Sequence, residues 1–226
     1  MQTDILIKRL RSTEFLRGLD ETSLTQLAKN ATWKVFVPDA AVFWEGDNET
    51  NLYYLHYGLL KILKASPDGR EQVLRHVQAG EIFNEIGVLA KQPNPATAVA
   101  LEESGIWLIP RQSIEEMLLA NPRMALQIIE SMAVKFTDLV SLAADLSLKS
   151  VKGRFASLLL EQAEGGVIER RSWSTQTEMA SRLGTVPDVL SRIIREWTKA
   201  GMIEMDKQQI RILDRAGLIK QSKATG

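Results

Sequence analysis

The feature that most constrains the fold is a long segment without a helix breaker. Neither glycine nor proline occurs between Pro122 and Gly153, and these two residues are the least compatible with a helix interior. Pro122 suits the first position of a helix, and Asn121 before it can act as a capping residue. We therefore expect one helix over residues 121–148, on the order of 40 Å long at about 1.5 Å per residue.

Apolar side chains recur along this helix in steps of four and three residues, over about three heptads. They are Ala125, Ile129, Met132, Phe136, Leu139, Ala143 and Leu146. This spacing is typical of the seam between two paired helices, and the small alanines would let the helices approach closely. We expect a homodimer seam here. A second apolar stripe on the same helix, expected to pack on the strand segment, comprises Ile128, Val134, Val140 and Leu142. The alternative is a single wide core face.

Residues 31–109 show short apolar or alternating runs separated by Gly, Pro, Asn and Asp. One separator is SPDG at 66–69, where proline presets φ and glycine can take a positive φ. Short strands at roughly ten-residue spacing predict a small antiparallel barrel or sandwich. Residues 1–30 predict helix, with Asp20 to Ser23 as capping residues and leucines at helical spacing at Leu16, Leu19, Leu24 and Leu27.

The composition excludes several kinds of site. The chain has no cysteine and two histidines, His56 and His76, which excludes disulfides, cysteine nucleophiles and cysteine-ligated iron–sulfur clusters. No nucleophile–base pair or phosphate loop is present, and carboxylates such as Glu81 and Glu85 at strand ends are usually solvated, so we do not expect an enzyme. Because no apolar run approaches the ~18 residues of a membrane span and no signal peptide begins the chain, we expect a cytoplasmic protein without a membrane partner.

The charge of the chain is unevenly distributed. Residues 1–147 carry 14 Lys+Arg and 19 Asp+Glu, whereas residues 148–226 carry 14 and 9, so the net charges are −5 and +5. A basic C-terminal third suggests that this end binds a polyanion.

The segment from Thr175 to Ile203 has the pattern of a helix–turn–helix. Its first four residues, TQTE, form a capping box, Gly184 permits a tight turn, and Pro187 suits the start of a second helix. The residues expected to point inward are Met179, Ala180, Leu183, Val189, Ile193, Ile194 and Trp197. The opposite side of the second helix carries Asp188, Ser191, Arg192 and Arg195. These residue types can read base edges, and MIEMDKQQIRIL after Gly201 predicts a two-stranded wing around Asp206 and Lys207.

Two long motifs resemble the Crp/Fnr superfamily of bacterial transcription regulators, and the resemblance covers essentially the whole chain. EGDNETNLYYLHYGLLKILKASPDGREQVLRHVQAGEIFNEIGVL is similar to the family's β-roll sensor domain, and TQTEMASRLGTVPDVLSRIIREWTKAGMI is similar to its helix–turn–helix. The resemblance implies an α+β chain that binds double-stranded DNA as a homodimer, on half-sites about one DNA turn apart, with RNA polymerase as a further partner. We expect an antiparallel β-roll sensor domain over 1–120, a dimerisation helix and hinge over 121–148, and a winged helix–turn–helix domain over 149–226. The hinge should lie near 146–148.

The resemblance also implies roles for residues near the second helix. The family's base-contacting positions fall on Pro187, Asp188, Ser191 and Arg192, a combination closer to the Fnr-like branch than to the cyclic-AMP receptor. Proline cannot read a base, so we assign direct readout to the other three. The residues that we expect to hold phosphates are Ser174, Thr175, Arg182 and Lys207.

The segment GEIFNEIGVLAKQPNPATAVA, from Gly80 to Ala100, corresponds to the family's ligand-binding turn. Relatives that bind cyclic nucleotides carry Gly-Glu for the ribose and, some ten residues on, Arg-Ser for the phosphate. Here the corresponding pairs are Asn84-Glu85 and Pro95-Ala96, and the expected effector pocket comprises Asn84, Glu85, Ile86, Pro95, Ala96 and Thr97. A buried phosphate without a paired cation is costly, so cyclic AMP is not the expected effector.

Three possibilities for the sensor domain remain. The pocket binds an apolar or weakly polar effector; it binds haem and senses a gas such as NO or CO; or it has lost ligand binding and the regulator is constitutive. For haem, His56 and His76 are the histidine ligand candidates, and a methionine or the N-terminus could supply a second ligand. A half-exposed histidine on a strand explains each of them without haem.

Overall fold

The computed structural model describes residues 2–13, 15–48, 51–169, 174–206 and 208–223. The chain divides into two compact units, Met1–Lys64 with Arg75–Thr137, and Ala65–Leu74 with Asp138–Gly226. No helix among the described residues is both long and apolar enough to cross a membrane.

The first unit begins with two helices, α1 (Gln2–Ser12) and α2 (Glu21–Asn30). Of the leucines at helical spacing, Leu24 and Leu27 lie in α2, whereas Leu16 and Leu19 lie in the segment between the two helices. Asp20 caps α2, because its carboxylate accepts a hydrogen bond of 2.8 Å from the amide of Ser23. The four leucines named above are all buried.

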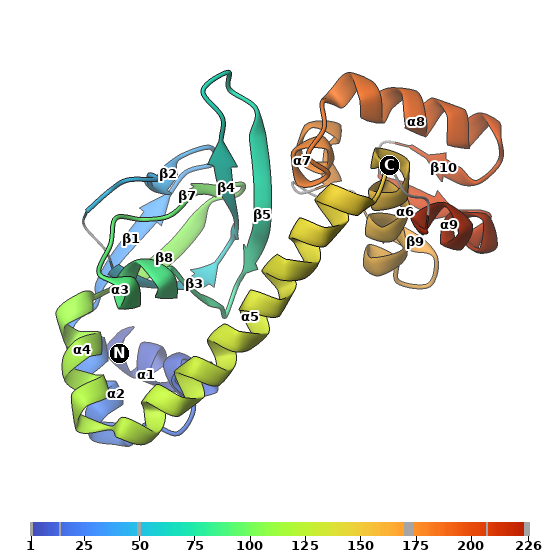
Figure 1. Ribbon diagram of the computed structural model, residues 1–226. Coiled ribbons are helices and arrows are strands. Elements are labelled where there is room, and N and C mark those ends of the chain that lie inside the picture. The colour runs from blue at the N-terminus through green and yellow to red at the C-terminus, as the bar shows by residue number, and fades with distance from the viewer. Residues whose placement is uncertain (1, 14, 49–50, 170–173, 207, 224–226) are drawn as a thin grey trace. The chain divides into compact units, whose positions relative to one another are not determined.

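Two four-stranded antiparallel sheets follow (Figure 1). In order across the first sheet, the strands are β1 (Thr32–Phe36), β8 (Ser104–Pro110), β3 (Asn51–Tyr57) and β6 (Ile82–Phe83). Across the second sheet they are β2 (Ala41–Phe43), β7 (Thr97–Ala100), β4 (Leu59–Ala65) and β5 (Glu71–Gln78). Both sheets contribute to one apolar core, in which the rings of Tyr53 and Phe83 are stacked 5.1 Å apart next to Phe43. The predicted antiparallel β-roll is confirmed.

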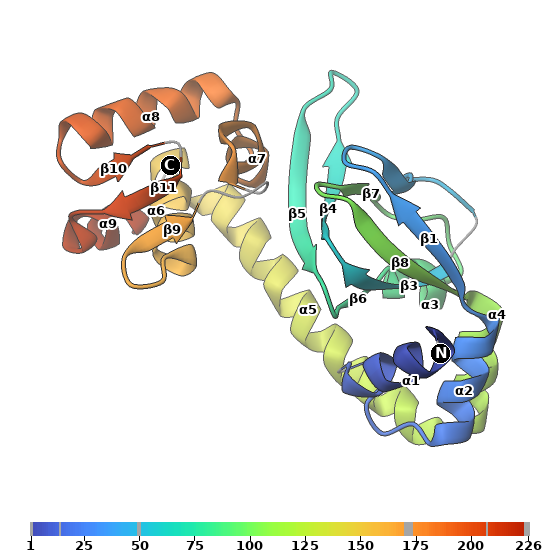
Figure 2. The ribbon, with the colours of Figure 1, turned by 180° about the vertical axis from the view of Figure 1, so that it is seen from behind.

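Three more helices pack on this unit: α3 (Glu85–Ala90), α4 (Arg111–Ala120) and α5 (Pro122–Leu148). Figure 2 shows α1, α2, α4 and the start of α5 gathered next to the sheets. Met124 and Ile128 of α5 are buried in the core that these helices share with β3 and β8. The predicted long helix is therefore present, and its start at Pro122 agrees with the sequence.

Two details of α5 differ from prediction. Asn121 does not cap α5 with its side chain; instead Nδ2 donates to the carbonyl of Met117 and to Ser23 Oγ, at 3.1 and 3.2 Å. Val134 and Val140, predicted to pack on the strands, are 61% and 52% exposed. Ile128 of the predicted stripe is buried as expected, but the core face of α5 runs through Met124, Ile128 and Ser131 and does not include Val134 or Val140.

The second unit contains the predicted helix–turn–helix and wing. Its elements are α6 (Val151–Gln162), β9 (Val167–Glu169), α7 (Gln176–Arg182), α8 (Pro187–Lys199), β10 (Ile203–Met205), β11 (Gln209–Ile212) and α9 (Arg215–Ser222). The strands form one antiparallel sheet in the order β10-β11-β9. Phe155 of α6 stacks on Trp197 of α8 with ring centroids 5.1 Å apart, inside the core of this unit. The sequence pattern indicated β10 and β11 but neither β9 nor α9.

Candidate nucleic-acid interface and ligand turn

The two helices of the helix–turn–helix begin and end where the sequence predicts. Thr175 caps α7, since its hydroxyl accepts a 3.2 Å hydrogen bond from the amide of Glu178. Gly184 lies in the turn with φ +62°, a backbone conformation that favours glycine. Pro187 occupies the first turn of α8, where no intrahelical partner for its nitrogen is needed.

One face of α8 holds the helix in the core of the unit. Leu190, Ile193, Ile194 and Trp197 are all buried, whereas Val189 is half-buried. The sequence pattern assigned Val189 to the inner face and did not single out Leu190, which is completely buried. A shift of one residue at the start of the helix accounts for the difference, and the rest of the predicted inner face is correct.

The opposite face of α8 is open to solvent and carries the predicted base-reading side chains. Asp188 and Arg192 are exposed, and Ser191 is half-buried. The Ser191 hydroxyl donates to Gln176 Oε1 over 2.9 Å, so this hydroxyl links α8 to the first residue of α7. Arg195, one turn further on, donates from Nε to the carbonyl of Ser191 over 3.3 Å.

The residues predicted to contact phosphates differ in their exposure to solvent. Thr175 is exposed, whereas Ser174 is completely buried, which does not favour a phosphate contact from its side chain. The guanidinium of Arg182 lies 3.2 Å from Glu161 of α6, and burial lowers the pKa of Arg182 below its ordinary value. Arg182 thus has a partner within the unit and joins α7 to α6. Lys207 lies outside the described residues.

A hollow of about 580 Å³ lies between α8 and the wing. It is lined by Gln176, Ile194, Arg195, Thr198, Lys199, Met205 and Asp206. Arg195 and Lys199 on this lining could contact phosphates, whereas the carboxylate of Asp206 on the same lining would repel them. The sequence pattern did not single out Thr198 or Lys199, although Lys199 in the last turn of α8 is the kind of residue that a search for basic helix ends would find.

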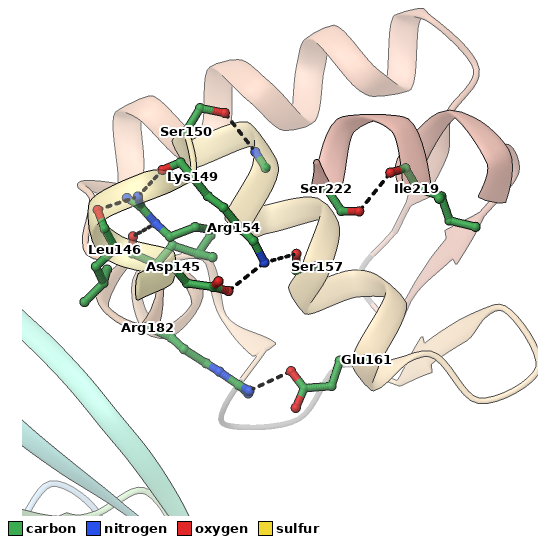
Figure 3. A network of polar contacts seen from close by, with 12 residues as sticks. Asp145, Leu146, Lys149, Ser150, Arg154, Ser157, Glu161, Arg182, Ile219 and Ser222 are labelled. Atoms are coloured by element: carbon green, nitrogen blue, oxygen red, sulfur yellow. Dashed lines mark hydrogen bonds and ion pairs between the residues drawn. The ribbon is translucent and has the colours of Figure 1, made fainter. Parts of the chain in front are cut away.

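A polar network joins the end of α5 to the helix–turn–helix (Figure 3). Arg154 of α6 donates from Nε to the carbonyl of Leu183 at 2.9 Å, and from one terminal nitrogen to the carbonyls of Lys149 and Leu146 at 2.7 and 3.4 Å. Lys149 in turn donates to Asp145 and to Ser157, at 2.9 and 3.2 Å. Burial lowers the pKa of Arg154, and Asp145 opposes this shift.

The same Arg154 side chain therefore binds carbonyls at the C-terminal end of α5 and in the turn of the helix–turn–helix. Carbonyls at helix ends lack donors within the helix, and the guanidinium of Arg154 donates hydrogen bonds to them. The network lies at the predicted hinge, and no sequence motif indicated it.

In the first unit, asparagine hydrogen bonds hold the segment that corresponds to the family's ligand-binding turn (residues 80–100, called the ligand turn below). Asn84 has φ +67° and donates from Nδ2 to the carbonyl of Asn51 and to Asn94 Oδ1, both at 3.0 Å. Gly87 lies directly beneath this pair: an added Cβ would come within 2.6 Å of Asn84 Oδ1 and 2.7 Å of Asn94 Oδ1. A side chain at Gly87 would thus disrupt the turn.

Glu85 has a partner that the sequence did not indicate. It is 5% exposed, and its Oε1 accepts a hydrogen bond from Lys135 Nζ of α5. Lys135 continues the core face of α5, on which Met124, Ile128 and Ser131 are buried. A lysine at the next position of a buried stripe is the signal that could have identified it.

The rest of the predicted effector pocket is divided between buried and exposed positions. Ala96 and Thr97 are buried, whereas Ile86 is 45% exposed and Pro95 is also exposed. Thr97 Oγ1 accepts a 3.0 Å hydrogen bond from the amide of Glu45. No cation stands at 95–96, so Lys135 is the cation that contacts the turn at Glu85.

His56 and His76 were the candidate ligands for a haem iron. Among the described residues, no group of three or more His, Cys, Asp or Glu side chains could hold a metal ion. The ring of His56 packs edge-on against Trp33 at 5.7 Å and lies beside Tyr54 and Tyr57. Burial lowers the pKa of His56, with a smaller contribution from Arg9. The aromatic packing accounts for the position of the His56 ring without haem. His76 is half-buried on β5.

The family comparison defines a class of protein with two domains in this order. The family described as a cyclic nucleotide-binding domain matches residues 33–121, and the family described as a Crp-like helix-turn-helix domain matches residues 153–221. The chain is therefore a regulator with a sensor-type β domain and a DNA-binding helix–turn–helix. It belongs to the Crp/Fnr family of transcription regulators, whose members are not enzymes.

Individual relatives are similar over most of the chain. The CRP-like cAMP-activated global transcriptional regulator of Mycobacterium tuberculosis is 24% identical over 213 residues, which cover 92% of this chain and 95% of that protein. The transcriptional activator protein FnrA of Stutzerimonas stutzeri is 25% identical over 183 residues, covering 78% and 75%. The structure of FixK2 from Bradyrhizobium japonicum has the same fold, with a TM-score of 0.73 at 20% identity over 87% of this chain and 99% of FixK2.

Proposed function

We propose that the protein is a homodimeric transcription regulator that binds a palindromic operator through α8. The observation that carries this proposal is the division of α8 into two faces. Leu190, Ile193 and Trp197 fix the helix in its unit, while Asp188 and Arg192 are exposed on the other side. A recognition helix needs this division, because its base-reading side chains must be free while its backbone is held rigidly.

The side chains of α8 then have different roles. Arg192 can donate two hydrogen bonds to guanine, and Asp188 can accept from the amino group of cytosine. Ser191 donates its proton to Gln176, so its hydroxyl oxygen is left to accept from a base. Thr175, together with Arg195 and Lys199 beside the hollow, would hold phosphates and fix the helix in the major groove.

Dimerisation through α5 is supported by the apolar surface of this helix. Ile129, Phe136 and Leu139 of the predicted seam are 61%, 67% and 39% exposed in the single chain. Met132, also assigned to the seam, is half-buried against the core of the first unit. A second copy of α5 would cover the exposed residues, and Ala125, Ala143 and Leu146 would extend the contact. RNA polymerase would be the partner of this dimer at a promoter.

The sensor domain is proposed to act without cyclic AMP. The Mycobacterium tuberculosis relative is described as cAMP-activated, but here Pro95 and Ala96 replace the residues that would hold a phosphate. Lys135, which reaches the turn from α5, is paired with Glu85. Neither Pro95 nor Ala96 supplies a counter-ion, so a cyclic phosphate bound at these positions would meet a desolvation cost of several kcal/mol.

The proposal is tested by selecting bound sequences from random double-stranded DNA with the full-length protein. We expect a palindrome whose half-sites are about one DNA turn apart. The selection is repeated with cyclic AMP and with candidate effectors, and we expect cyclic AMP to leave the yield and the sequence unchanged. Recovery of no common sequence, under any of these conditions, would contradict operator binding.

A further inference from the structure

We propose that the Glu85–Lys135 ion pair takes the place of a bound effector and holds the sensor domain in its DNA-binding form without a small molecule. The inference deepens the proposed function and depends on it, since it concerns how DNA binding is controlled. It assigns a role to Lys135, which lies outside the family motif of the ligand turn.

The two partners come from the two elements that an effector would have to connect. Glu85 is the first residue of α3 and lies in the ligand turn, whereas Lys135 lies on α5. They are 50 positions apart in the sequence and meet within one compact unit. An ion pair here links the turn directly to the helix that continues into the second unit.

The burial of the pair makes this link depend on both partners. The side chain of Glu85 is 7% exposed and that of Lys135 is 37% exposed. A carboxylate with so little access to water is strongly destabilised when its cation is removed, because water does not replace the lost partner. Exposed ion pairs in the same unit, such as Lys64–Glu45 with side chains 49% and 43% exposed, do not have this property.

The surroundings of Glu85 fix its position before any ligand could do so. Asn84 donates hydrogen bonds to Asn51 and Asn94, and a Cβ added at Gly87 would come within 2.7 Å of a side-chain oxygen of Asn84 and of Asn94. The start of α3 therefore has little freedom, and Glu85 faces Lys135 as part of a rigid turn. In a sensor that requires a ligand, the corresponding carboxylate would be free to bind the hydroxyl groups of that ligand. Here the carboxylate of Glu85 is paired with the ammonium group of Lys135.

The experiment compares the full-length wild type with Glu85→Gln, Lys135→Met, the double variant Glu85→Gln/Lys135→Met, and Lys135→Arg. Lys64→Met is the matched control, since it removes a lysine from an exposed pair. Three quantities are measured without an added effector: affinity for the selected operator, affinity for a scrambled duplex, and hydrogen exchange of the α3 amides. Native mass spectrometry of the wild type determines whether a small molecule copurifies, and thermal unfolding followed by circular dichroism confirms that each variant is folded.

We expect the wild type to bind its operator with no copurified molecule. Each single neutral variant should lose about tenfold or more in operator affinity, with faster exchange in α3 and unchanged affinity for scrambled DNA. The double variant should be no weaker than the weaker single variant, because it leaves no unpaired buried charge. Lys135→Arg should retain operator affinity, as should Lys64→Met.

Several results would overturn the inference. One is a wild type that binds its operator only with an added or copurified small molecule. Another is operator affinity that is unchanged in both single variants, or faster exchange in α3 without any loss of operator affinity, which would make the pair merely structural. A wild type that selects no DNA sequence at all would instead contradict the proposed function, so the two failures are distinguishable.

Discussion

Arg192 and Lys199 lie on the same helix, yet their expected contacts with DNA differ. Arg192 is exposed near the start of α8, and Lys199 lines the hollow beside the wing. Arg192→Ala should weaken binding to the operator by about 1–3 kcal/mol and relax the base preference at one position of each half-site. Lys199→Ala should weaken binding to all sequences alike and reduce the slope of log affinity against log salt by about one.

Titrations of both variants against the operator, its single-base variants and a scrambled duplex at several salt concentrations measure these effects. Equal losses on operator and scrambled DNA for Arg192→Ala would show that this arginine binds phosphate and does not read a base.

His56 gives the protein a pH dependence whose sign is fixed by its surroundings. Burial, with a smaller effect of Arg9, lowers the pKa of His56 in the folded protein below its ordinary value of 6.5. Between the two pKa values the unfolded chain binds the extra proton, so the contribution to stability is present above pH 6.5 and is lost as the pH falls through the folded pKa. The free energy of unfolding should decrease more between pH 7.5 and 5.5, about one unit either side of the ordinary pKa, in the wild type than in His56→Gln. If urea unfolding gave the same change in the free energy of unfolding between these pH values for both proteins, the prediction would be contradicted.

Single residues were predictable from the sequence where local geometry decides their role. Thr175 caps a helix because it stands three positions before Glu178, and Pro187 begins one for an equally local reason. Ser174 and Lys135 depend on which parts of the chain meet in space. The burial of Ser174 and the contact of Lys135 with a residue 50 positions away follow from tertiary packing. The stripe on α5 could place Lys135 on the core face, but no spacing in the sequence identifies its partner.

At the scale of elements, Arg154 holds together the end of α5, the start of α6 and the end of α7. Arg154→Met removes the donor to the carbonyls of Leu146, Lys149 and Leu183. We expect the free energy of unfolding to fall by about 1–3 kcal/mol, because partly buried acceptors lose their partners. Arg154→Lys should be intermediate, since a single ammonium group does not reproduce the geometry of the guanidinium.

Urea unfolding of each variant measures this loss. The control is Lys152→Met, two positions before Arg154 on α6, which breaks an exposed ion pair with Glu196 of α8. This substitution should lower the free energy of unfolding by no more than about 0.5 kcal/mol. If Arg154→Met and Lys152→Met were equally stable, the network at the end of α5 would contribute nothing.

The elements themselves were largely predictable, and the exceptions have a physical reason. The long helix is bounded by Pro122 and the turn sequence SPDG marks the turn between β4 and β5, because proline and glycine act locally. The wing's third strand, β9, is three residues long and pairs with β11, and so short a strand carries no periodicity to detect. The faces of α5 were partly misassigned because an apolar residue such as Val134 looks the same in a sequence whether it meets the core or solvent.

At the scale of the whole molecule, the apolar surface of α5 determines the expected assembly. Phe136 is 67% exposed, and in a symmetric dimer the truncation Phe136→Ala removes one ring from each copy. The dimer should be weakened by about 2–4 kcal/mol. Operator affinity should fall with it, although Phe136 touches no DNA in the proposed arrangement, because two recognition helices must bind together.

Analytical ultracentrifugation and operator titration of Phe136→Ala measure the two effects. Leu119→Ala is the matched control, because Leu119 is an 84% exposed apolar residue at the end of α4 and lies outside the proposed seam. An intact dimer with unchanged operator affinity would exclude Phe136 from the interface.

The Glu85–Lys135 pair has a consequence for how cells would set the output of such a regulator. A switch whose counter-ion is part of the polypeptide does not follow the level of any metabolite. Operator occupancy would then depend on the number of copies in the cell, and at low copy number dimer formation would make that dependence steeper than proportional. Synthesis and degradation of the protein, more than a diffusible signal, would determine when its genes respond.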